Sequence, residues 1–212
     1  MKRVRLLWVC DNSKETRLNM HVTQILSRWL GQRLVVGHAM RADALVRVVQ
    51  ALVLGGKAAL TQLGRNRAGS AGVKHHIKAV DRLLGNRHLH RECSSIYRAI
   101  ARMQIEETLR DGKSHRFGFG LRYARSSSAQ RIEVLLLLVA LASLVLWLVG
   151  LAGRAQNLAR SLQANTVRHR LVLSTPFVGR LLLLRRLALF PPTAINNALA
   201  QLQALAALPQ LA

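Results

Sequence analysis

Residues 134–153, VLLLLVALASLVLWLVGLAG, decide the fold of this chain, because all 20 of them are uncharged. At the rise of an α-helix this stretch spans about 30 Å, the thickness of the apolar core of a bilayer. Arg131 and Arg154 flank it. Taken by itself, the stretch is typical of a transmembrane helix, so a small basic membrane protein with a single span is one interpretation of the chain.

The charge of the chain is strongly positive and unevenly distributed. The 32 Lys and Arg residues outnumber 9 Asp and Glu residues, which gives a formal net charge of +23. All the acids lie at or before Glu133, and the segment that follows has seven Arg and no acid. Such an excess indicates a polyanionic partner, either nucleic acid or an anionic membrane surface.

Cysteine usage and the N-terminus favour a cytoplasmic protein. Cys10 and Cys93 are the only cysteines, which is too few for a disulfide framework and favours a reducing cytosol. The apolar stretch at residues 6–10 is too short for a signal peptide. Residues 1–19 are expected to form an irregular extension.

Apolar spacing elsewhere predicts further helices, and the fold class is therefore mainly α. No alternating or β-branched run typical of a strand occurs between Gly64 and Ser128. The expected helices begin near Asn19 and Ala194 and cover residues 42–54, 57–63, 73–84 and 90–103. Gly55 and Gly56 are expected to end the helix at 42–54, and Gly64 is expected to end the helix at 57–63.

Residues 57–84 fit a helix-turn-helix layout with a long turn. In the second helix, Val73, Ile77, Val80 and Leu84 share an apolar face. The opposite face is expected to meet DNA through Lys74, His75, Lys78 and Arg82. Three further cations are expected to meet phosphates, namely Arg65, Arg67 and Arg87. The alternative is a solvated basic helix face without a partner.

Two other groups of residues carry weaker signals. His88, His90 and Cys93 are of the types that bind zinc, but their spacing matches no common zinc module. Surface histidines on basic elements are the preferred interpretation. Gly118-Phe119-Gly120 lacks the downstream glycine and the preceding strand of a phosphate-binding loop, so a plain loop is expected there.

Two stretches resemble the IS-four family of DDE transposases. Residues 102–113, RMQIEETLRDGK, match the Arg-x3-Glu-x6-Lys portion of the family signature through Arg102, Glu106 and Lys113, and residues 114–118 continue the match. Residues 80–90, VDRLLGNRHLH, resemble the N-terminal DNA-binding region of that family. The resemblance covers roughly residues 19–187.

The resemblance implies a role for each matched residue. Glu106 matches the catalytic glutamate, the third carboxylate of a triad that holds two Mg²⁺ or Mn²⁺ ions. Lys113 matches a lysine that contacts DNA near the cleavage site, and Arg102 matches the signature arginine. Such enzymes bind the terminal inverted repeats of an insertion sequence, excise it and insert it elsewhere.

The departures from the family pattern concern the metal site. Family members are about twice as long, and their ribonuclease-H-like strands, with both catalytic aspartates, lie between the two matched regions. Here those regions are nearly contiguous, and no Asp lies between Asp81 and Asp111. Because one carboxylate cannot hold two hard divalent cations, Glu106 is expected to bind metal only if other ligands are supplied, and catalysis is not expected from this chain alone.

The resemblance also offers a second interpretation of residues 134–153, as a helix that packs on the catalytic sheet. Since that sheet is missing, the helix is expected to lack its partner surface and to expose a large apolar patch. The expected order is an extension at 1–19, a helical DNA-binding domain at 20–98, helices left over from the catalytic domain at 99–190 and a tail at 191–212.

The sequence thus predicts a double-stranded DNA-binding protein of the bacterial cytoplasm that derives from a transposase. An intact transposase is a possible further partner. A membrane protein anchored through residues 134–153 is the alternative.

Overall fold

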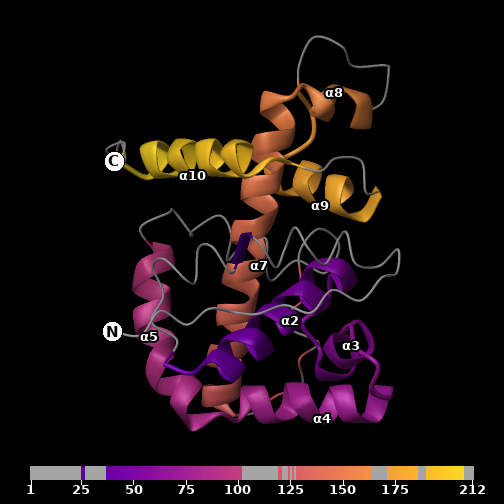
Figure 1. The fold of residues 1–212 in the computed structure, drawn as a ribbon, viewed down its shortest axis with the longest axis vertical. Helices are drawn as coiled ribbons and strands as arrows, with labels where there is room; N and C mark the ends of the chain where they lie inside the picture. The colour runs from indigo at the N-terminus through magenta and orange to yellow at the C-terminus, as the bar shows by residue number, and fades with distance from the viewer. Residues whose placement is uncertain are drawn as a thin grey trace.

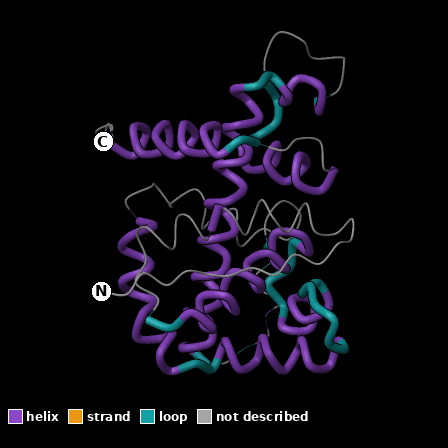
Figure 2. Tube along the Cα trace, in the orientation of Figure 1, coloured by secondary structure: helices purple, strands orange, loops and turns teal. Residues whose placement is uncertain are grey.

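The computed structural model describes residues 25–26, 37–101, 119–120, 124, 126, 128–163, 171–185 and 190–207. Within these ranges the regular elements are helices joined by loops, without a strand (Figure 2). The prediction of a mainly α fold is confirmed. The helices are α2 (Ala39–Gly55), α3 (Leu60–Arg65), α4 (Val73–Leu84), α5 (Arg87–Ala101), α7 (Ala129–Ala155), α8 (Leu158–Leu162), α9 (Thr175–Arg185) and α10 (Pro192–Ala207).

Helix α7 forms the axis of the molecule (Figure 1). It is apolar on every side, and a helix of that kind is stable in water only when other elements cover it all round. Helices α2, α4 and α5 contact it in the half that contains its N-terminus, and α8, α9 and α10 contact the other half (Figure 1). The expectation that residues 134–153 lack a partner surface is wrong, because other helices of the chain cover them.

By length and composition α7 is the one candidate membrane span found among the described residues. Of its most apolar window, 83% is buried inside the protein. Leu137, Leu138 and Leu141 are fully inaccessible to solvent. The helix is therefore long and apolar enough to cross a membrane, and other helices of the chain cover most of its surface.

Polar contacts attach both ends of α7 to its neighbours. Near its start, Arg131 forms an ion pair with Asp81 of α4, and the Tyr97 hydroxyl of α5 donates to the carbonyl oxygen of Glu133 over 3.0 Å. Near its end, the Arg154 guanidinium donates to the carbonyl oxygen of Leu173 over 2.6 Å. The helix is therefore held in register as well as covered.

Helix α2 is the second buried helix in the front half of the molecule, the half that surrounds the N-terminal part of α7. Its residues from Leu45 to Val53 are almost all buried, and Val46 and Val49 belong to the same core cluster as α7. It ends where the sequence predicts, because Gly56 adopts a left-handed conformation with φ of 63° and its N–H donates to the carbonyl oxygen of Leu52. The predicted helix that begins near Asn19 is described only at Ile25 and Leu26, which are helical and buried.

The back half of the molecule surrounds the C-terminal part of α7. Its tightest contact is the crossing of α7 and α9, where glycines let the two backbones touch. A Cβ atom added at Gly150 would lie 2.0 Å from the carbonyl oxygen of Thr175, and one added at Gly179 would lie 2.0 Å from that of Leu146. Both obstacles are backbone atoms, which no side-chain rotation can move. The crossing therefore requires glycine at both positions.

We predict that Gly150→Ala and Gly179→Ala each destabilise the protein by about 1–3 kcal/mol, as overpacked cores do. The clash should outweigh the roughly 1 kcal/mol by which Ala favours a helix over Gly. Urea unfolding of the full chain measures the change. Gly85→Ala is the matched control, since its Cβ would make an ordinary contact of 3.6 Å. Variants at Gly150 and Gly179 as stable as this control would contradict the crossing.

Candidate nucleic-acid interface

Helices α3 and α4 and the turn at 66–72 form a compact helix-turn-helix unit. A Cβ at Gly64 would lie 2.8 Å from both the Cα and the backbone nitrogen of Ile77, so Gly64 allows the two helices to cross closely. The side-chain amide of Asn66 donates to the carbonyl oxygen of Gln62 over 2.9 Å and caps the end of α3. The turn is therefore positioned by a backbone contact and a cap.

Helix α3 differs from its expected range of 57–63. Residues 57–59 precede the helix because the Ala58 N–H donates to the carbonyl oxygen of Phe119 over 2.8 Å, a partner outside any helix. Gly64, which was expected to stop the helix, lies within it and serves the crossing with α4. Helix α4 covers the predicted range of 73–84.

The buried face of α4 is rotated from the predicted one. His76, Val80, Leu83 and Leu84 are buried, whereas Val73 is 50% exposed and Ile77 is only partly buried. The inner stripe thus begins at residue 76 and not at 73. The reason is tertiary, because α3 crosses α4 at Ile77 itself, where Gly64 lies against its backbone, and His76 is buried beside this crossing.

The outer face of α4 carries the predicted DNA-binding residues. Lys74, Lys78 and Arg82 follow one another at intervals of four residues, which aligns them in one stripe along a helix. All three are exposed, as are the neighbouring His75 and the first residue of α5, Arg87. The last two predicted phosphate contacts lie nearby in the chain, with Arg65 exposed at the end of α3 and Arg67 partly buried in the turn.

The acidic residues near this face are matched by arginines. Arg131 forms an ion pair with Asp81, the acid of α4, and Arg47 forms one with Asp43 at 2.7 Å. Arg41 forms a third ion pair with Glu92. The main effect of these ion pairs is electrostatic. Because each of the three carboxylates is paired with an arginine, none of them neutralises the exposed cations of α4.

Beneath this face lies a polar cluster formed by Arg47, Arg67 and His76. Burial lowers the pKa of His76 below its ordinary value of 6.5, and the cations Arg67, His75 and Arg47 lower it further. Burial is also the main cause that lowers the pKa of Arg67, followed by the charge of Arg47. Protonation of His76 is therefore disfavoured in the folded protein, because it would add a third cation to the cluster.

We predict that the protein loses stability as the pH falls below 6.5. The pKa of His76 is lower in the folded than in the unfolded chain, so the unfolded chain binds the proton first. The stability from neutral His76 is complete above 6.5 and is lost as the pH falls through the folded pKa. Urea unfolding between pH 5 and 8 measures this slope. His76→Gln should flatten it, and His75→Gln, at an exposed neighbour, should not. An unchanged slope in His76→Gln would refute the assignment.

The residues considered for zinc do not come together as ligands. Cys93 is fully buried, and burial, with the carboxylates of Glu133 and Glu92, raises the pKa of its thiol to about 12. His90 contacts the carbonyl oxygen of Leu84 through Nε2, and His88 is exposed. Over the described ranges no group of three His, Cys, Asp or Glu side chains is placed to hold a metal ion.

The three residues matched to the transposase signature, Arg102, Glu106 and Lys113, lie outside the described residues. The same holds for Gly118, whereas Phe119 and Gly120 are in a loop, as predicted. Neither a scan against protein-family models nor searches of curated proteins and of solved structures found a match to this chain.

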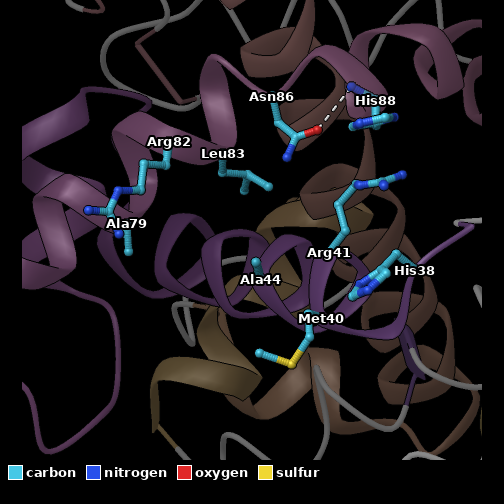
Figure 3. A pocket seen from close by; sticks show the side chains of 9 residues that line it. All are labelled: His38, Met40, Arg41, Ala44, Ala79, Arg82, Leu83, Asn86 and His88. Carbon is cyan, nitrogen blue, oxygen red and sulfur yellow. Dashed lines mark hydrogen bonds between the residues drawn. The ribbon is translucent and has the colours of Figure 1, made fainter.

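Sequence reasoning missed one further feature, a groove beside α4. It has a volume of about 430 Å³ and runs between the first turns of α2 and the junction of α4 with α5 (Figure 3). His38 and Arg41, from the start of α2, line it together with Arg82 and His88. These pairs are some 40 residues apart in the chain, so local spacing held no signal for them.

Proposed function

We propose that this chain is a DNA-binding protein that derives from a transposase of the IS-four family and recognises the ends of an insertion sequence. The observation that carries the proposal is the exposed stripe of Lys74, Lys78 and Arg82 on the second helix of a helix-turn-helix unit. The net charge of +23 supports it, because a polyanion is the natural partner of such a chain.

The position of α4 suits insertion into the major groove. It lies along one edge of the molecule, and no other labelled helix covers its outer side (Figure 1). The N-terminal residues of a recognition helix contact base edges. In this chain those residues are Val73, Lys74 and His75, all exposed. A lysine suits the acceptors of guanine, and an exposed valine suits the methyl group of thymine.

The later cations of the stripe suit the backbone. Lys78 and Arg82 lie one and two turns beyond Lys74, where a recognition helix leaves the bases and approaches phosphates. Arg87 extends the cationic surface beyond Gly85. The contact with α3 at Gly64 and the ion pair of Asp81 with Arg131 hold α4 in the orientation that presents this surface.

We predict that Lys74→Ala and Lys78→Ala each weaken binding to duplex DNA and reduce the slope of log K against log salt by about one. Fluorescence anisotropy of the full chain with a duplex of element-end sequence, at several salt concentrations, measures both quantities. Lys74→Ala should also reduce the preference over random duplex, because Lys74 is assigned to base edges.

Arg185→Ala is the matched control, since Arg185 is exposed on α9 in the back half of the chain. It should lower the slope by less than either lysine variant. Equal effects of all three substitutions would mean that DNA binding depends on net charge alone and would sink the assignment of α4.

The proposal includes the loss of catalysis. In the family pattern three carboxylates hold the metal ions, and only Glu106 of this chain matches one of them. We predict that the purified chain, with Mg²⁺ or Mn²⁺, neither nicks nor joins element-end DNA that it binds. Gel analysis of end-labelled duplex tests this, with binding to the same duplex as the positive control. Metal-dependent cleavage that is lost in Glu106→Gln would overturn the proposal.

A protein that occupies element ends without cutting them would compete with an intact transposase in the bacterial cytoplasm. Burial of α7 among helices favours this soluble form over the alternative of a single-span membrane protein. A membrane span would need the apolar surface that α2, α5, α9 and α10 already cover.

A further inference from the structure

The groove beside α4 brings cations from three helices to one place. Its walls come from the start of α2, the second half of α4 and the start of α5 (Figure 3). The lining residues that matter here are His38, Arg41, Ala44, Ala79, Arg82 and His88. None of the residues that line it is acidic. An anion is therefore the natural occupant.

The two ends of the groove differ in their donors. Arg82 lies at one end, while Arg41, His38 and His88 gather at the other (Figure 3). Arg41 donates to Glu92 through one nitrogen, and a guanidinium has five N–H donors, so others remain. Within the described part of the chain, the side chains of His38, Arg82 and His88 form no hydrogen bond or ion pair.

Between these ends the groove is apolar. Ala44 of α2 and Ala79 and Leu83 of α4 line it there, and their side chains are apolar (Figure 3). A strand of DNA has the same alternation, because each deoxyribose, which is largely apolar at its edge, separates two phosphates. An inorganic anion would use only one end of such a groove. A sugar with a phosphate on each side would use both ends and the apolar middle.

We propose that this groove binds one sugar–phosphate step of the DNA strand that borders the major groove occupied by α4. The inference rests on the proposed function, and it adds His38, Arg41 and His88 to the interface. Continuity supports it, because Arg82 ends the stripe of α4 and also lines the groove. A strand whose phosphates contact Lys78 and Arg82 would therefore reach the groove.

The test fills the groove without changing its charge. Ala79 is half-buried in the wall, and Ala79→Leu places a larger apolar side chain where the sugar would lie. Full-chain protein and random-sequence duplex of 20 base pairs are measured by anisotropy at several salt concentrations. We expect affinity to fall on the order of tenfold and the salt slope to drop by about one phosphate contact. Ala155→Leu, an equal enlargement at an exposed site on α7, should change neither.

A second variant keeps the test decisive if Ala79→Leu does not fold, as judged by its unfolding transition. His38 and His88 are both exposed, and His38 makes no side-chain cap to α2, so their joint replacement by Ala removes donors without removing a structural contact. This double variant should also weaken binding. Wild-type affinity in the double variant, or in a folded Ala79→Leu, overturns the proposal.

A free nucleotide offers the same sugar–phosphate chemistry, so thymidine 5′-monophosphate is tested alone by NMR of the histidine side chains. Shifts confined to His38 and His88 that Ala79→Leu abolishes support the groove chemistry. If the chain binds this nucleotide but no duplex, the proposed function fails while the groove remains a nucleotide site. If it binds duplex through Lys74 and Lys78 with no effect of the groove variants, the proposed function stands and the groove proposal fails.

Discussion

The burial of α7 is the constraint on which the rest of the structure depends. A helix that is apolar all round must be covered all round, and each Leu or Val buried in it contributes about 1.5–3 kcal/mol. No single neighbour can do this, so helices from both the front and the back of the chain surround α7 and share one core with it. Gly150 and Gly179 complete the cover by letting α9 approach to backbone contact.

This core determines what α4 presents to solvent. Val80 and Leu84 belong to the same core cluster as α7, and Arg131 at the start of α7 pairs with Asp81 of α4. Because these contacts hold one side of α4 against the core, Lys74, Lys78 and Arg82 lie on the opposite side, which faces solvent. The DNA interface that we propose is therefore a consequence of core packing as well as of charge, and the groove beside it arises where α2 and α5 meet the same helix.

Much of this architecture could be predicted from sequence, because its signals are local. The range of α4 and the glycine that ends α2 follow from spacing and from the conformational freedom of Gly56. The inward turn of His76 could not be predicted, since it depends on the crossing of α3 and α4 at Gly64. The helices that cover α7 could not be predicted for a similar reason: its uniformly apolar composition shows that it avoids water but does not show what covers it. Likewise, His38 and Arg41 join Arg82 only in the folded chain.

Fractionation of cells that express the full chain tests whether α7 is a core helix or a membrane span. The lysate is treated with nuclease, to release protein held by DNA, and the membranes are then washed with alkaline carbonate. We expect the chain to be recovered in the soluble fraction, because protein already covers 83% of the most apolar window of α7. Retention of the chain in the carbonate-washed membranes would contradict it.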